Sequence, residues 1–234
     1  CAAKASDGGF VLSGAKTFVP EGMSATTFVV AAKTYAADIE LFLVPANTAG
    51  VSRTGMATVD NRDYARVTLS DVAVLAESHL GALPGGELHE HLLNRACAGV
   101  AMEMLGVGCS SFEMTLDYLK TRKQFGKVIG SFQALGHRAA ELYSAQEMAR
   151  SCAEAGVIAI DNDADDQAAM SALSKAKTGE FLFDMSNQLI QIHGGIGMTD
   201  DYDAGLYLKR ARALEALYGN QALHRDRYAT LLGF

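Results

Sequence analysis

The stretch Leu80-Gly81-Ala82-Leu83-Pro84-Gly85-Gly86 divides the chain into two parts of different character. Pro84 is the last of three prolines, and a long proline-free segment rich in Ala, Leu, Met, Glu and Lys follows it. Proline removes a backbone donor and clashes inside a helix, so a segment of this composition is typical of a helical bundle. We therefore predict a β-rich segment over residues 1–82 and a helical bundle over residues 83–234.

Short runs of β-branched or aromatic residues characterise the first part. They are residues 10–12, 27–30, 41–44 and 65–69, and turn signals occur at residues 7–9 and 49–50. The residues that open the chain are also strand-like. Several short strands with such turns predict an antiparallel sheet, a partial barrel or sandwich.

Apolar residues recur at helical spacing in the second part. The pattern predicts helices over residues 87–122, 132–160, 167–192, 204–217 and 222–232. Long, Ala-rich helices with short connections favour antiparallel packing. The predicted fold class is α+β: an antiparallel β segment followed by an antiparallel helical bundle.

Composition restricts the partners that this chain can bind. It is 49% hydrophobic and 20% charged with a formal net charge of -7, and nucleic acid or an anionic membrane requires a basic face. No apolar run is long enough to cross a bilayer, and the four cysteines form no metal-binding pair. We expect a cytoplasmic protein without a metal, whose partner is a small molecule or another protein.

Basic and aromatic residues gather in the first candidate site, Arg122-Lys123-Gln124-Phe125-Gly126-Lys127, with Phe132 and Gln133 shortly after it. One interpretation is a helix end, where basic residues suit the dipole and Gly126 is the left-handed cap. The other is a ligand site, where a guanidinium binds a diphosphate, Phe125 is an aromatic wall and the amides of Gln124 and Gln133 add contacts.

Glycines dominate the second candidate site, Gln191-Ile192-His193-Gly194-Gly195-Ile196-Gly197-Met198-Thr199. Such a run is explained equally by a helix cap followed by a turn. Alternatively, the missing side chains let the backbone approach a ligand closely, while Gln191 and His193 add polar contacts. It is not the Gly-x-Gly-x-x-Gly fingerprint that follows a strand in dinucleotide-binding folds.

These two segments, in this order and at this separation, resemble the Arg-x-x-Phe-Gly and Gln-x-x-Gly-Gly-x-Gly segments of the acyl-CoA dehydrogenase family. The resemblance implies a flavoprotein whose FAD diphosphate and adenosine are bound across a subunit interface. The implied cofactor contacts are Arg122, Gln124, Phe125, Phe132, Gln133, Gln191, Ile192, His193, Gly194 and Gly195.

The first part is also similar to this family. Residues 12–20 look like the family's strand and turn beside the flavin, with Phe18 where Trp is common and Pro20 where Thr is common. Residues 43–51 and 67–81 are similar to the closing strands of its middle domain. The family's N-terminal helical domain and the start of its middle domain have no counterpart here, so we expect no complete active site within this chain.

The family's chemistry requires a base that removes the α-proton of a CoA thioester while the β-hydrogen leaves as hydride. In the family this Glu usually occupies a Tyr-Glu-Gly-Thr-like segment. Here the matching segment is residues 217–221, so either Gly219 stands in its place or the Glu has been deleted. Some members carry the base on the first long helix, at a position that falls near Ala96 or Cys97.

Two carboxylates lie near these positions, but neither is a convincing substitute. Glu215 lies one turn before Gly219 and Glu103 two turns beyond Ala96, which are displacements of roughly 6 and 10 Å along a helix. Hydrogen-bond reach is about 3 Å, so we expect structural or solvated roles for both. The sequence of this chain therefore identifies no catalytic residue, and this residue is unknown.

Our leading hypothesis is a non-catalytic or half-site subunit of a heteromeric acyl-CoA dehydrogenase, similar to paired-subunit enzymes that oxidise bulky CoA thioesters. Its expected partners are an acyl-CoA substrate, an electron-transfer flavoprotein or similar acceptor, and a homologous subunit in a dimer of dimers. Two alternatives stay open: a flavin-dependent monooxygenase of the same superfamily, and a structural homologue that has lost the cofactor.

Overall fold

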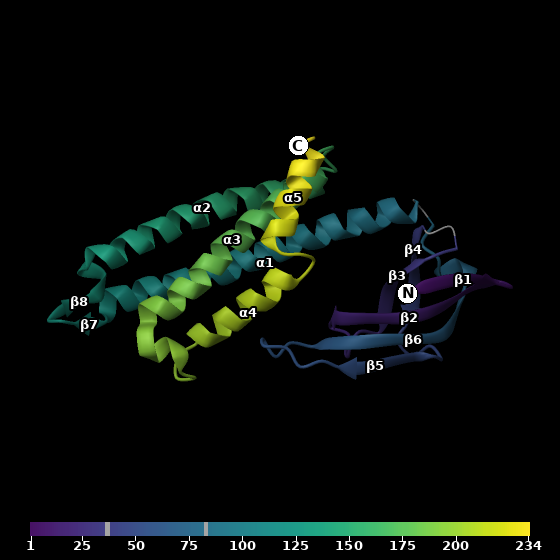
Figure 1. Ribbon diagram of the computed structural model, residues 1–234, viewed down its shortest axis with the longest axis horizontal. Helices are drawn as coiled ribbons and strands as arrows, with labels where there is room; N and C mark the ends of the chain where they lie inside the picture. The colour runs from purple at the N-terminus through teal and green to yellow at the C-terminus, as the bar shows by residue number, and fades with distance from the viewer. Residues whose placement is uncertain (36–37, 82–83) are drawn as a thin grey trace. The chain divides into compact units, whose positions relative to one another are not determined.

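The computed structural model describes residues 1–35, 38–81 and 84–234, which form two compact units, Cys1–Leu92 and Leu93–Phe234 (Figure 1). Each unit has its own hydrophobic core. The predicted boundary between residues 82 and 83 lies outside the described residues.

One six-stranded sheet, in the order β4-β3-β1-β2-β6-β5, makes up most of the first unit. Its strands are β1 (Ala2–Ser6), β2 (Gly9–Pro20), β3 (Thr27–Lys33), β4 (Ile39–Pro45), β5 (Val51–Gly55) and β6 (Tyr64–Leu75), and a short 3₁₀ helix, η1 (Ala76–Ser78), follows. Neighbouring strands are antiparallel except β1 and β3, which are parallel where Ala2 pairs with Lys33. The predicted strand runs are confirmed, and β5 is an addition.

Side chains alternate between the core and solvent along these strands. On β3, Phe28, Val30 and Ala32 are buried while the residues between them are more exposed. On β6 the alternation changes phase, because Leu69 and Val72 are both buried. The pairing of β2 with β6 shifts register at this point, so a β-bulge keeps both ends of the long strand directed toward one core.

Five helices form the second unit and confirm the predicted bundle, each within two residues of its expected ends. They are α1 (Gly85–Thr121), which begins before the division between the units, α2 (Gln133–Asp161), α3 (Gln167–His193), α4 (Ala204–Ala216) and α5 (Gln221–Leu231). α3 packs against α2, α4 and α5. Among the described residues, no helix is both long and apolar enough to cross a membrane.

Glycine allows the helices to approach closely at two points. A Cβ on Gly108 of α1 would lie 2.3 Å from a ring carbon of Phe181 on α3, and a Cβ on Gly156 of α2 would lie 2.8 Å from the side chain of Ser174 on α3. Protein interiors are packed at crystal density, so neither neighbour has free space into which it can move. These two glycines therefore set the separation of α3 from α1 and α2.

We expect Gly108→Ala to destabilise the protein by about 1 to 3 kcal/mol, because the added methyl group overpacks the contact with Phe181. Gly106→Ala is the matched control, since it lies on the same helix with nothing within 4 Å of the added carbon. It should stabilise by about 0.5 to 1 kcal/mol through helix propensity. Chemical denaturation of both variants measures the difference, and equal effects would contradict this packing argument.

Candidate functional site

The segment that follows α1 folds into a tight hairpin. β7 (Lys123–Gln124) pairs with β8 (Lys127–Val128), and Phe125 and Gly126 form the turn between them. Both turn residues have positive φ, 52° and 76°, as in a type I′ turn. A bulky residue rarely adopts this conformation, yet the Phe125 side chain is also 89% exposed. The hairpin therefore holds an aromatic ring in solvent at a conformational cost, which is common at functional sites.

The interpretation of Gly126 as a helix cap is wrong. α1 ends at Thr121, and Gly126 owes its positive φ to the hairpin turn further along the chain. The short β7–β8 pairing, which sequence periodicity does not report, separates the glycine from the helix end.

The backbone of Arg122 is fixed on both sides. Its N–H donates to the Tyr118 carbonyl at 2.9 Å, and its own carbonyl accepts from the Ile129 N–H at 2.9 Å. Its guanidinium is exposed and, within the described part of the chain, makes no hydrogen bond or ion pair. A fixed backbone with an unpaired guanidinium suits a bound anion such as a phosphate.

α2 begins close to this hairpin, after a 3₁₀ turn, η2 (Ile129–Ser131). Its N-cap residue, Phe132, provides no side-chain cap, so the first N–H groups of the helix remain available to an anion. The Phe132 ring makes an edge contact with Phe125, with centroids 6.0 Å apart, and Lys127 Nζ lies 4.3 Å from its centroid. Gln133 is exposed at the start of the helix.

The glycine segment forms a turn with an open outer side. α3 ends at His193, and a 3₁₀ turn, η3 (Gly194–Met198), follows with Gly194 at φ 64° and ψ −138°. Nothing lies within 4 Å of where a Cβ would be on Gly194 or Gly195. A Cβ on Gly197 would instead lie 3.0 Å from the Cβ of His193, an atom of the same helical unit. The first two glycines therefore expose bare backbone, whereas the third allows close internal packing.

Two of the predicted cofactor contacts have buried side chains. Ile192 packs in a cluster with Leu119 and Ile129, and His193 is 3% exposed. His193 Nδ1 donates to the Leu189 carbonyl at 2.8 Å, and burial lowers the pKa of the imidazole, so it is neutral at pH 7. These two side chains support the glycine turn from below, while Gln191 and the two open glycines face solvent.

The hairpin and the glycine turn lie at the same end of the helical unit (Figure 1). The Tyr118 ring stacks against His193 with centroids 4.3 Å apart, and its hydroxyl donates to the His193 carbonyl at 3.4 Å. Phe132 packs on the cluster that contains Ile192. The structure therefore brings together the two segments that the sequence separates.

The segment that matches the family's base position is a short connection between α4 and α5. Tyr218 and Gly219 have positive φ, 57° and 102°, and Asn220 caps α5 by accepting from the Leu223 N–H at 3.0 Å. A Cβ on Gly219 would lie 2.4 Å from a methyl carbon of Leu223. The connection therefore carries no carboxylate, and a side chain at residue 219 would be strained because L residues rarely adopt a φ of 102°.

A buried lysine, which the sequence analysis did not single out, holds this connection. Lys175 is 1% exposed, and its Nζ donates to the carbonyls of Leu214 at 3.2 Å, Glu215 at 3.4 Å and Gly219 at 2.9 Å. Burial lowers the pKa of Lys175 to about 8. The sequence feature that could have identified it is a lysine on the buried face of α3, between the buried residues Ala172 and Thr178.

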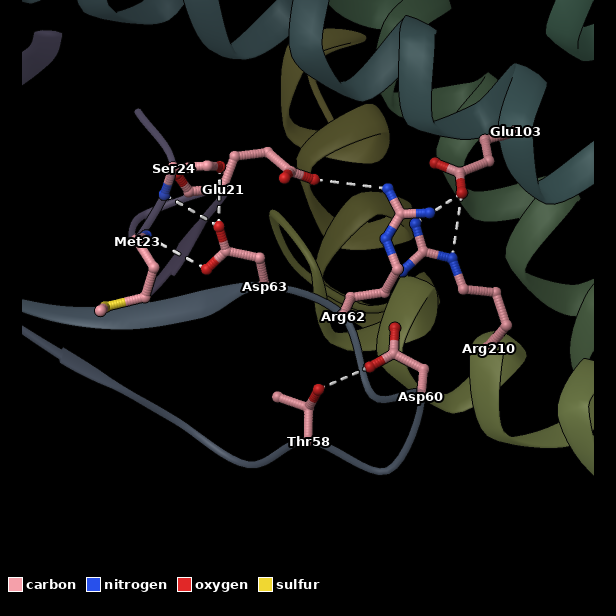
Figure 2. Close-up of polar contacts among 9 residues, drawn as sticks. All are labelled: Glu21, Met23, Ser24, Thr58, Asp60, Arg62, Asp63, Glu103 and Arg210. Carbon is pink, nitrogen blue, oxygen red and sulfur yellow. Dashed lines mark hydrogen bonds and ion pairs between the residues drawn. The ribbon is translucent and has the colours of Figure 1, made fainter. Parts of the chain in front are cut away.

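The alternative base position on α1 also lacks a carboxylate. Ala96 is half-buried, and Cys97 is 1% exposed with its Sγ 3.9 Å from His224 Nε2. The nearby Glu103 accepts from Arg210 Nε at 3.0 Å, as Figure 2 shows. Similarly, Glu215 Oε2 lies 3.3 Å from a guanidinium nitrogen of Arg212 on its own helix. Both glutamates are thus held in ion pairs, as expected for structural residues.

The loop after β2, which follows the segment similar to the family's flavin-side turn, is held by one carboxylate (Figure 2). Asp63 accepts from the Met23 N–H at 3.1 Å, the Ser24 N–H at 3.0 Å and the Ser24 hydroxyl at 2.7 Å. The Ser24 hydroxyl, with these N–H groups and Arg53, lowers the pKa of Asp63. Phe18, just before this loop, has φ 52° and a side chain that is 58% exposed.

Comparison with known families identifies both units. A family model described as acyl-CoA dehydrogenase, C-terminal domain, matches residues 85–232, and one described as acyl-CoA dehydrogenase, middle domain, matches residues 1–72. The chain therefore belongs to the acyl-CoA dehydrogenase family. Members of this family are FAD-dependent oxidoreductases.

Individual relatives agree with this assignment. Acyl-CoA dehydrogenase IpdE2 of Mycolicibacterium smegmatis is 37% identical over 55% of this chain and 39% of its own length, and the bovine mitochondrial isobutyryl-CoA dehydrogenase is 26% identical over 92% and 54%. The solved ChsE4-ChsE5 complex from Mycobacterium tuberculosis superposes with a TM-score of 0.92 at 26% identity, covering 99% of this chain and 62% of the matched chain. The chain thus spans about half the length of the curated relatives it matches.

We expect the stability of the protein to rise between about pH 8 and pH 10.5 through Lys175. Its folded pKa of about 8 lies below the ordinary lysine pKa of 10.5, so the unfolded chain binds this proton more tightly across that window. The cost of burying the charge is therefore present below pH 8 and is relieved as pH rises. The gain is at most about 3 kcal/mol, from about 1.4 kcal/mol for each pKa unit.

Chemical denaturation of the wild type and of Lys175→Met at a series of pH values measures this effect. As pH rises from about 8 to 10.5, the free energy of unfolding of the wild type should increase relative to that of Lys175→Met. Lys177→Met, on the same helix in an ion pair with Glu180, controls for loss of a lysine. A difference between wild type and Lys175→Met that is independent of pH would contradict the prediction.

Proposed function

We propose that this chain belongs to a subunit of an acyl-CoA dehydrogenase-type oxidoreductase that binds the diphosphate part of FAD and leaves removal of the α-proton to a partner subunit. One observation carries the proposal. An unpaired guanidinium and an open glycine turn meet at one end of the helical unit, whereas neither position of the family's base carries a carboxylate.

The exposed groups at this end fit a dinucleotide. The Arg122 guanidinium and the uncapped N-terminus of α2 suit the two negative charges of a diphosphate. The bare backbone at Gly194 and Gly195 allows a ligand to approach more closely than side chains would permit. The Phe125 ring offers an apolar surface to the cofactor.

Exposed amides complete the proposed set of contacts. Gln124, Gln133 and Gln191 are exposed near the hairpin and the glycine turn, and each amide can both donate and accept hydrogen bonds. Phe132 acts by holding the Phe125 ring, and Ile192 and His193 act through the backbone that they fix. When bound, FAD supplies the acceptor for the hydride that leaves the β-carbon of the substrate.

The base must come from elsewhere, because α-proton removal from a thioester needs a carboxylate within about 3 Å of that proton. Glu103 and Glu215 are engaged in ion pairs with arginines, and the α4–α5 connection has a glycine with positive φ at residue 219, where the side chain of an acid would be strained. A homologous subunit that carries the Glu would supply it. The proposed substrate is a bulky CoA thioester.

Two solved assemblies support a heteromeric arrangement. The ChsE4-ChsE5 complex and the Tcur3481-Tcur3483 steroid ACAD, each named for two components, match 99% of this chain at 26% and 28% identity. We therefore propose a homologous acyl-CoA dehydrogenase subunit as the partner, in a dimer of dimers. A relative named as the CarC subunit of a caffeyl-CoA reductase-Etf complex supports an electron-transfer flavoprotein as the acceptor.

We expect Arg122→Ala to weaken FAD binding by about 10- to 100-fold, the loss expected when a charge-assisted hydrogen bond of about 1.5 to 3 kcal/mol is removed. Lys123→Ala, the neighbouring exposed cation on the hairpin, is the matched control and should change the affinity much less. The measurement is a fluorescence titration of FAD on the protein in its native assembly, together with its visible spectrum. Unchanged FAD affinity in Arg122→Ala would remove the basis of the proposal.

We further expect Glu103→Gln and Glu215→Gln to retain kcat within about threefold in the assembly with the partner subunit. Loss of a general base costs about 100- to 10,000-fold, which the equivalent Glu→Gln change in the partner should produce. Steady-state dehydrogenation of an acyl-CoA with an artificial electron acceptor measures both. A large loss from either variant in this chain would identify that glutamate as the base, and full turnover by this subunit without its partner would also refute the half-site proposal.

A further inference from the structure

We propose that Tyr118 is a positioning residue that fixes the Arg122 hairpin and the glycine turn relative to each other, and thereby sets the affinity for the FAD diphosphate. The proposal rests on the function proposed above and adds to it a residue that touches neither the cofactor nor the substrate. Three sets of contacts carry it.

Tyr118 contacts the arginine segment through its backbone. It lies one helical turn before Arg122, and its carbonyl accepts the Arg122 N–H at 2.9 Å. The next residue, Leu119, is 4% exposed, and its carbonyl would lie 2.8 Å from a Cβ on Gly130. The segment at Gly130, which follows the hairpin, therefore packs closely against the last turn of α1. A shift of that helical turn would move the hairpin.

Tyr118 contacts the glycine turn through its side chain. Its ring stacks on His193 with centroids 4.3 Å apart at an interplanar angle of 30°, and its hydroxyl donates to the His193 carbonyl at 3.4 Å. This carbonyl belongs to the last residue before Gly194. The Tyr202 ring contacts both of these rings, with its centroid 4.7 Å from that of His193 and 6.1 Å from that of Tyr118. Three rings therefore form a support beneath the glycine turn.

The glycine turn needs such a support. Glycine is the residue with the greatest backbone freedom, and nothing covers the outer side of Gly194 and Gly195 within the described part of this chain. A turn that is free on one side binds a ligand strongly only when its other side is fixed, because otherwise binding must order it.

The test is the Tyr118→Leu variant, which removes the ring but keeps an apolar side chain in the cluster. We expect the dissociation constant for FAD, measured by fluorescence titration on the native assembly, to rise at least tenfold. Tyr143→Leu is the matched control, because this tyrosine on α2 stacks on Phe112 within the same unit. It should leave FAD affinity within about twofold. Melting temperatures of both variants report any general loss of stability.

A double-mutant cycle separates positioning from a general structural role. If Tyr118 acts by placing Arg122, the double variant Tyr118→Leu, Arg122→Ala should lose less affinity than the product of the two single losses. Simple multiplication of the two losses would overturn the inference. Tyr202→Leu, which removes another ring of the support, should weaken FAD binding about threefold and provides the readout if Tyr118→Leu does not fold.

The two proposals fail in distinguishable ways. If the wild-type assembly binds no FAD, or Arg122→Ala binds it normally, the proposed function itself is refuted. If the wild type binds FAD and Arg122→Ala loses it, while Tyr118→Leu and Tyr202→Leu both retain wild-type affinity, only the positioning role of Tyr118 is refuted.

Discussion

Close packing around α3 is the constraint on which the helical unit depends. α3 packs against α2, α4 and α5, and glycines at residues 108 and 156 allow α1 and α2 to approach it. A side chain at either glycine would overlap an atom of α3, so the position of α3 is fixed from several directions. The α3 helix carries Lys175 in its first half, and Gly194 follows its last residue. Packing in the middle of the bundle thus locates both regions of functional interest.

These two regions treat their polar groups in opposite ways. At the α4–α5 connection, polar groups turn inward, where three backbone carbonyls surround the Lys175 ammonium. At the hairpin end, the Arg122 guanidinium has no hydrogen bond or ion pair among the described residues, and Gly194 and Gly195 leave the outer side of the backbone uncovered. The first arrangement gives rigidity, and the second leaves binding capacity. This combination fits the proposed role of a subunit that holds a cofactor and leaves proton transfer to its partner.

Helical periodicity predicted the five helices because each spans several turns and buries one face. The same reasoning did not predict the hairpin, since its two-residue strands have no period and Phe125 adopts a conformation that its side chain disfavours. It also missed β5, where Val51 is the lone aliphatic residue. The candidate segments were found as motifs, but the inward direction of Ile192 and His193, and the carbonyls around Lys175, depend on tertiary packing that the sequence does not report.

The geometry of the α4–α5 connection restricts how an acid could be introduced there. Only Tyr218 and Gly219 lie between Leu217, the C-cap residue of α4, and the N-cap residue of α5. Both residues have positive φ. A glutamate exchanged for Gly219 would place its Cβ against Leu223. A single codon change at Gly219 is therefore a poor evolutionary route to a base at this position, because the new side chain would be strained by the left-handed backbone. Under the proposed half-site function, such a lineage would more readily keep its reliance on a second gene product than acquire a base of its own.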